Sequence, residues 1–350
     1  MTDSPVAAAN TFTKAGSASP GKVRPLVTIA VPAYNRPALL AEALASIEAQ
    51  TVRRSLEVIV CDDGRLEANR QLVARFPPER FRYIANERTL GAVANWNRCL
   101  ERAEGEWVMI LHEDDCLYPW YLETVWPLLV SDSVAVAMKV VQGSVPPEVP
   151  RPRGRPKVRW YRPPFFLKSS MTPFPGVLIR RDAARQLGGF DGKWGPVADF
   201  DFWYRLSCLG RIEDIRAVGA FYRISPGQWT DDAWARMLNL AHLLRLRIAQ
   251  EQFPNHPVFG HWLARFFTRS NARAYDRRFG RGPAVLRRCL DFKRCMMASL
   301  PTGWVWQALK IATALSGRHS PQYDHEGGRD PQIQPAGGEP GRLAQAHSFR

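Results

Sequence analysis

Three consecutive acidic residues, Glu113, Asp114 and Asp115, follow a short apolar run from Trp107 to Leu111. A short continuous apolar run is typical of a strand that is buried on both faces. Carboxylates at the end of such a strand are costly unless a partner compensates their charge. A hard divalent cation that also holds an anionic group such as a phosphate suits them. The simpler alternative is a solvated acidic turn.

Polar residues also follow three earlier apolar runs. Tyr34 and Asn35 come after the first run, Asp62 and Asp63 after the second, and Asn86 after the third. In open α/β sheets, ligands bind beyond the carboxyl ends of the strands. We therefore expect these side chains and the acidic turn to form one site, which favours the metal interpretation over a solvated turn.

Apolar and helical patterns alternate along the N-terminal part of the chain. This alternation predicts βαβ crossovers and an α/β fold with a mostly parallel central sheet flanked by helices. The predicted strands are 26–31, 56–61, 81–84, 107–111, 133–140 and 176–181, and the predicted helices are 38–50, 66–75, 91–103, 119–130, 182–187 and 198–210.

Two common nucleotide-binding classes are disfavoured. The chain has no GxGxxG after the first strand and no GxxxxGK[ST] anywhere, which argues against a dinucleotide oxidoreductase and a P-loop ATPase. Its 6 cysteines form no CxxC pair, so a structural zinc site is not expected. Scattered cysteines and the lack of an apolar leader predict reduced thiols in a cytoplasmic protein.

Asp199 and Asp201 lie at the start of the predicted helix 198–210. Asp199 shares a face with Phe202, Trp203 and Leu206, whereas Asp201 can form a surface ion pair with Arg205 four residues on. A helix N-cap is one interpretation of Asp199. The other is a desolvated carboxylate with a raised pKa that serves as a general base.

The remaining segments differ in composition. We predict disorder in residues 1–24 and 317–350. We predict an exposed basic loop at 143–164 that is either an inert insertion or a mobile lid or acceptor-binding loop. The formal net charge is +15, and residues 236–318 contain 15 Lys or Arg against 3 Asp or Glu. The predicted basic helices (232–253, 257–278, 283–297 and 304–316) could contact an anionic membrane surface or dock on the preceding domain.

Six motifs in order resemble those of the family 2 glycosyltransferases, over about residues 26–225. They are VPAYNR (31–36), VCDDG (60–64), NERTLGAVANWNR (86–98), AEGEWVMILHEDD (103–115), PGVLIRRDAARQLGGFD (175–191) and ADFDFWYRL (198–206). The resemblance implies a GT-A catalytic domain, which we place at 25–230, followed by a helical region at 231–316.

The resemblance also implies roles for individual residues. Pro32 and Tyr34 would line the base and ribose, Asp63 would bond the base, and Asp114 would lie near the ribose. Asp115, with Glu113, would bind Mg²⁺ or Mn²⁺, and Asp199 would be the catalytic base. The strand-end argument adds Asn35, Asp62 and Asn86 to the nucleotide-sugar site.

This chain departs from the family pattern in three places. Glu113 replaces the first Asp of the DxD motif, and Ala198 precedes Asp199 where a Glu is usual. No histidine follows Tyr222 and Arg223, which puts a third protein ligand to the metal in doubt.

Together these features predict an inverting, metal-dependent glycosyltransferase. It would move a sugar from a UDP or dTDP donor to a hydroxyl of a glycan or lipid-linked acceptor in cell-surface polysaccharide synthesis. The predicted location is cytoplasmic, with peripheral contact on the inner face of the plasma membrane. The alternatives are a nucleotidyltransferase of related fold and a degenerate basic binding protein, and no nucleic-acid partner is expected because such binding does not require acidic strand ends.

Overall fold

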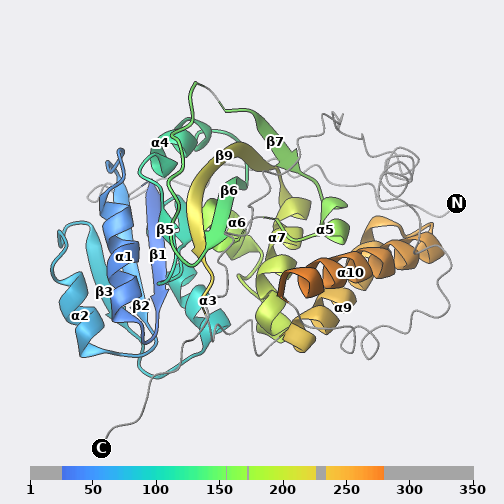
Figure 1. Ribbon diagram of the computed structural model, residues 1–350, viewed down its shortest axis with the longest axis horizontal. Coiled ribbons are helices and arrows are strands. Elements are labelled where there is room, and N and C mark those ends of the chain that lie inside the picture. The colour runs from blue at the N-terminus through green and yellow to red at the C-terminus, as the bar shows by residue number, and fades with distance from the viewer. Residues whose placement is uncertain (1–25, 155, 172, 226–233, 280–350) are drawn as a thin grey trace, which may run out of the picture. The chain divides into compact units, whose positions relative to one another are not determined.

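Figure 1 shows the computed structural model, which describes residues 26–154, 156–171, 173–225 and 234–279. The predicted disordered ends, 1–24 and 317–350, lie outside these residues. So do the predicted helices 283–297 and 304–316.

Four parallel strands form the N-terminal half of the sheet, in the order β3-β2-β1-β4. In this register Ala33 lies opposite Asp62, and Asp62 lies opposite Ala85, so the carboxyl ends of β1, β2 and β3 share one edge. Helices α1, α2 and α3 connect the strands in βαβ fashion. The bounds are β1 Val27–Ala33, α1 Pro37–Glu48, β2 Leu56–Asp62, α2 Glu67–Val73, β3 Phe81–Ala85, α3 Ala92–Arg102 and β4 Trp107–Ile110.

The sheet continues from β4 through β8, β6, β9 and β5, and β7 also pairs with β9. Strand β8 runs antiparallel to both β4 and β6, and β9 runs parallel to β6. The predicted α/β fold is thus confirmed, with the antiparallel pairings confined to its second half. The bounds here are β5 Cys116–Leu117, α4 Tyr121–Val125, η1 Trp126–Leu128, β6 Ala135–Gly143, β7 Val158–Tyr161, α5 Phe165–Lys168, η2 Phe174–Gly176, β8 Val177–Arg180, α6 Arg181–Gln186, η3 Gly192–Val197, α7 Ala198–Leu209 and β9 Ile212–Arg223.

The core is built from alternating strand residues and one face of each helix. Helix α1 begins at Pro37, whose fixed φ suits a first helical position. Its Leu40, Leu44 and Ile47 are fully buried and share a cluster with Ile29 and Val31 of β1. Their spacing of four and three residues places them on one helix face, so α1 covers one face of the sheet near the site.

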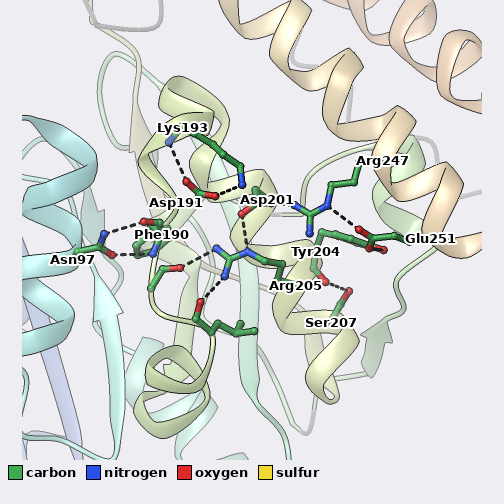
Figure 2. A network of polar contacts seen from close by, with 12 residues as sticks. Asn97, Phe190, Asp191, Lys193, Asp201, Tyr204, Arg205, Ser207, Arg247 and Glu251 are labelled. Atoms are coloured by element: carbon green, nitrogen blue, oxygen red, sulfur yellow. Dashed lines mark hydrogen bonds and ion pairs between the residues drawn. The ribbon is translucent and has the colours of Figure 1, made fainter. Parts of the chain in front are cut away.

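Two C-terminal helices, α9 (Trp234–Gln252) and α10 (Pro257–Phe279), pack on α5 and on the η3–α7 region (Figure 1). Figure 2 shows part of this contact: Arg247 of α9 reaches Asp201 of α7, and the Tyr204 hydroxyl donates to Glu251 at 2.6 Å. For these two predicted helices, the docking alternative is the one observed.

The predicted surface position of Asp201 is wrong. The ion pair with Arg205 is present at 2.7 Å, but Asp201 is fully buried because α9 covers it and adds Arg247 at 3.0 Å. A periodicity argument made within α7 alone had no means of including a helix that starts some 30 residues later.

The segment 143–164 is not entirely loop, which corrects that prediction. Residues 158–161 form β7, an edge strand antiparallel to β9. The Tyr118 hydroxyl donates to the carbonyl of Pro147 at 2.7 Å, and Arg151 pairs with Glu123. These contacts attach the segment to the outside of the sheet. Within the described part of the chain, no helix is long and apolar enough to cross a bilayer.

Candidate active site

A cleft of about 700 Å³ opens at the carboxyl ends of the first strands. Six of the predicted site residues line it: Pro32, Tyr34, Asn35, Asp63, Glu113 and Asp114. Arg36, Trp96, His112 and Tyr222 are among the other lining residues. The prediction that one site collects these strand ends agrees with this geometry. The roles given to the individual residues stay predictions.

Asp115 lies beneath the cleft and is fully buried. Its Oδ1 accepts a hydrogen bond from the backbone N–H of Arg223 at 2.9 Å, whereas its Oδ2 has no partner in the described structure. Burial, and secondly the charge of Asp114, raise the pKa of Asp115 well above its usual value. A buried carboxylate oxygen without a donor is rare, and this oxygen could serve as a ligand to a cation.

Asp114 and Glu113 face Arg36, which follows the first strand. The guanidinium donates from Nη1 to Asp114 at 2.7 Å and from Nε to Glu113 at 2.9 Å. The other oxygen of Glu113 accepts the backbone N–H of Tyr34 at 2.9 Å. Glu113 therefore joins the acidic turn to the loop after β1, and its predicted metal contact stays a prediction.

His112 joins the two aspartates. One possible ligand atom from each of His112, Asp114 and Asp115 lies within 4.8 Å of the others. The imidazole Nδ1 is 3.8 Å from the Oδ2 of Asp115, too far for a hydrogen bond, and Nε2 is buried with no partner that the structure describes. These donors fit a divalent cation.

Asp63 is held rigidly at the end of β2. Its carboxylate accepts the backbone N–H groups of Leu90 at 2.7 Å and Gly91 at 2.9 Å, and the Nδ2 of Asn86 at 2.9 Å. These contacts bring the loop after β3 against the end of β2. Asp63 therefore reaches the cleft with its carboxylate already oriented.

Asp62 and Asn86 are not among the residues that line the cleft. Asp62 is fully buried and accepts from Gly64, Leu66, Asn69 and Tyr83. These bonds shape the tight turn in which a Cβ on Gly64 would lie 1.8 Å from the carbonyl oxygen of Tyr34. Asp62 therefore positions the turn, and Asn86 positions the carboxylate of Asp63. Direct contact with a nucleotide stays a prediction for both residues.

The acidic turn is held from behind by Arg223, at the end of β9. Its Nε donates to the carbonyl of Asp114 at 2.9 Å and its Nη1 to the carbonyl of Ser144 at 3.0 Å. A further ion pair joins Arg223 to Glu42 of α1. One buried side chain therefore connects the turn, β9 and α1.

Residues 28–187 match the model of glycosyl transferase family 2. The match covers β1 to α6, and with them the acidic turn and the residues that line the cleft except Tyr222 and Ser225. These residues are a family 2 glycosyl transferase domain.

Two relatives and one solved structure illustrate the range of the likeness. The uncharacterised protein MT1568 of Mycobacterium tuberculosis is 30% identical over 54% of this chain and 64% of its own length. A GalNAc(5)-diNAcBac-PP-undecaprenol β-1,3-glucosyltransferase of Campylobacter jejuni is 34% identical over 29% of this chain and 33% of its own length. This chain spans less than two thirds of the length of either relative.

The family 2 domain also has the expected fold. The chain resembles TarS of S. aureus, solved in complex with UDP-GlcNAc, with a TM-score of 0.54 and 18% identity over 73% of each chain. At this identity the likeness concerns the fold alone, and it agrees with the predicted GT-A architecture.

Asp199 lies in the first turn of α7 rather than at its cap, which is Val197. It is partly buried, and burial raises its pKa to about 6. An aromatic cluster connects α7 to the acidic turn, because Phe174 contacts His112 at 4.8 Å and Trp203 at 5.5 Å between ring centroids. Trp203 lies four residues after Asp199, so this cluster ties its helix to the family 2 domain.

The sequence argument overlooked His112, Arg36 and Arg223 as parts of the site. His112 and Arg36 follow strands of the family 2 domain, so the strand-end rule that selected Asp63 applies equally to them. Arg223 is different, because it reaches Asp115 from 108 positions away and no local pattern marks it.

Proposed function

We propose that this protein is an inverting, metal-dependent glycosyltransferase. It would transfer a sugar from a nucleoside diphosphate donor, UDP or dTDP, to a hydroxyl of a glycan or lipid-linked acceptor in cell-surface polysaccharide synthesis. The observation that carries the proposal is the Asp114–Asp115 turn, with a buried oxygen lacking a partner in the described structure, beside a cleft of a family 2 domain.

The residues around the cleft have separate tasks in this proposal. Pro32 and Tyr34, which is half exposed, would contact the base and ribose, and Asp63 would accept a hydrogen bond from the base. Asp115, with Glu113, would hold Mg²⁺ or Mn²⁺, and Asp114, predicted to lie near the ribose, also offers an oxygen to that cation. When bound, the cation supplies Lewis-acid neutralisation of the charge that develops on the leaving diphosphate.

Asp199 would act on the acceptor side of the sugar. An acceptor hydroxyl has a high pKa, so it needs a base as its oxygen attacks the anomeric carbon. Asp199 would take the hydroxyl proton as the new C–O bond forms and the bond to the donor phosphate breaks. Attack opposite the leaving group inverts the anomeric centre. A carboxyl with a pKa of about 6 is suited to this role near neutral pH.

The acceptor and location rest on more distant evidence. The Campylobacter relative is named for transfer to an undecaprenol-linked glycan, which supports a lipid-linked acceptor. A cytoplasmic protein with peripheral contact on the inner face of the plasma membrane would suit such an acceptor. The basic surplus of residues 236–318 supports that contact.

The first experiment titrates UDP into the purified protein by calorimetry, with and without Mn²⁺, because TarS shares the fold and was solved with a UDP-sugar. Metal-dependent binding would justify screening UDP-sugars and acceptors for transfer. If UDP does not bind, dTDP and GDP are tested next. Failure of all three would overturn the proposal and favour a degenerate binding protein.

The Asp199→Asn variant separates chemistry from donor binding. We expect it to bind UDP with unchanged affinity and to lose transfer by about 10²- to 10⁴-fold, the usual contribution of a general base. The matched control is Asp191→Asn, which alters an aspartate that pairs with Lys193 near the surface. Normal turnover by the Asp199→Asn variant would contradict the role given to Asp199.

A further inference from the structure

The imidazole of His112 lies beside the two aspartates proposed to hold the cation. From this arrangement we infer that His112 is a further protein ligand of that cation and that it makes the site prefer Mn²⁺ to Mg²⁺. The inference rests on the proposed function, because it concerns the cation of that site. It names a ligand that the motif-based prediction did not include.

Two buried atoms at this point lack partners in the described chain, the Oδ2 of Asp115 and the Nε2 of His112. The Nδ1 of the same ring is 3.8 Å from that Oδ2, so the two side chains face each other without forming a hydrogen bond. Buried polar atoms are normally satisfied, and an ion bound by the Oδ2 of Asp115 and by one ring nitrogen of His112 would satisfy the carboxylate oxygen.

The spacing agrees with ligands of one ion. Ligands at about 2.1 Å from an octahedral ion lie about 3 to 4 Å from one another. The three candidate atoms of His112, Asp114 and Asp115 lie within 4.8 Å. The donors therefore surround a volume that suits a single small cation.

The ring of His112 packs in a cluster with two aromatic residues. Trp96 lies 5.6 Å and Phe174 4.8 Å from it, between ring centroids, and these two rings also contact each other at 4.8 Å. These contacts limit the rotation of the imidazole. A ligand that is already oriented loses less conformational entropy when it binds an ion. The aromatic packing thus serves binding as well as the core.

The nitrogen donor determines which ion is favoured. Mg²⁺ binds oxygen ligands almost exclusively, and an imidazole adds affinity for first-row transition ions. A site made from carboxylates alone would not separate Mg²⁺ from Mn²⁺ strongly. With His112 as a ligand, we expect Mn²⁺ to bind more tightly than Mg²⁺ in the presence of UDP.

Electron paramagnetic resonance of Mn²⁺ tests the inference without an activity assay. The full chain is titrated with Mn²⁺ in the presence of UDP, and Mg²⁺ is then added as a competitor. Pulsed measurements detect a ¹⁴N nucleus coupled to the bound Mn²⁺. We expect ¹⁴N coupling in the wild type, its loss in His112→Gln, and Mn²⁺ affinity about 10- to 100-fold lower in that variant.

The variant His112→Asp is the conservative partner, because it replaces the nitrogen by a carboxylate oxygen. It should still bind Mn²⁺ but without ¹⁴N coupling, and its preference for Mn²⁺ over Mg²⁺ should fall. Absence of ¹⁴N coupling in the wild type, its persistence in His112→Gln, or no binding of Mn²⁺ would each overturn the inference. If the wild type nevertheless transfers sugar, the proposed function stands and only the inference about His112 fails. If the wild type neither binds UDP nor transfers sugar, the proposed function and the inference both fail.

Discussion

Asp115 and Asp201 are both aspartates whose side chains are fully buried, and their surroundings differ in one respect. Both oxygens of Asp201 accept hydrogen bonds from arginines, Arg205 at 2.7 Å and Arg247 at 3.0 Å (Figure 2). Asp115 receives one backbone N–H, and its second oxygen has no partner among the residues that the structure covers. Burial is the same in the two cases, so the unsatisfied oxygen is what distinguishes the candidate site at Asp115 from the structural network at Asp201.

The difference extends to what each aspartate connects. Asp201 joins α7 to α9, and Arg205 continues to the backbone carbonyls of Leu187 and Gly189. Asn97 then joins α3 to the same turn through both backbone polar groups of Phe190. The partners of Asp201 and of the residues connected to it are all protein groups, so we expect this network to contribute to stability. The partners of Asp115 are incomplete until a ligand binds.

The largest expected effect is that of Asp115→Asn on ligand binding. We expect Mn²⁺-dependent UDP affinity to fall by about 1000-fold, because the charge that holds the cation is lost. The free energy of unfolding, measured in urea with a chelator present, should change by less than about 1 kcal/mol, because the amide has the same shape. Unchanged Mn²⁺-dependent binding in calorimetry would contradict the comparison.

The reverse result is expected for Asp201→Asn. Removing the charge leaves Arg205 and Arg247 with a neutral partner, and breaking a buried ion pair costs about 3–5 kcal/mol. Because Arg247 is 37% exposed, water compensates part of this loss, and we expect about 2–3 kcal/mol by urea denaturation. UDP affinity at a temperature where the variant is folded should be unchanged. A variant as stable as the wild type would show that the network contributes little.

A smaller effect is expected for Arg223→Lys, which sharpens the comparison at the acidic turn. The backbone N–H to Asp115 remains, but the guanidinium contacts with the carbonyls of Asp114 and Ser144 are lost. We expect UDP affinity to fall about 10-fold with Mn²⁺ and little without it, as for other residues that orient metal ligands. The control Glu42→Gln should have less effect, because Glu42 is 53% exposed. Equal losses with and without Mn²⁺ would indicate general distortion instead.

Much of the fold could be predicted because its signals are local. Each of the first four strands is an apolar run ended by polar residues, and the parallel register then brings those ends to one edge. The strand-end rule therefore located the cleft. It did not distinguish Asp63, which lines the cleft, from the preceding residue Asp62, whose side chain points into a buried hydrogen-bond network. That choice depends on the geometry of the turn at Gly64.

The parts that could not be predicted depend on distant residues. Arg223 reaches the acidic turn from the last strand in the chain, and Arg247 of α9 contacts Asp201 from 46 positions away. No periodicity within β4 or α7 contains this information. The aromatic contacts of His112 with Trp96 and Phe174 likewise come from three separate elements, so its position beside the two aspartates became visible only in the structure.

An effect of similar size is expected from the pH dependence at Asp199, which extends the comparison to a third aspartate, one that is partly buried. Burial raises its pKa to about 6, so the base form is lost as the pH falls through 6. With a donor and acceptor identified by screening, kcat/KM should fall about 10-fold from pH 7 to pH 5 in the wild type. The residual rate of Asp199→Asn should not follow this curve.

The same pKa has a consequence for stability, with a definite sign. The folded protein holds the proton of Asp199 more tightly than the unfolded chain, so the wild type loses stability as the pH rises from about 4 to 6. The variant Asp199→Asn has no proton to release. Relative to the wild type it should therefore gain stability between pH 4.5 and pH 7.5, on the order of 1 kcal/mol after allowing for partial exposure. A difference that does not change with pH, measured by urea denaturation at both values, would mean that Asp199 is solvated like an ordinary surface carboxylate and is a poor choice of base.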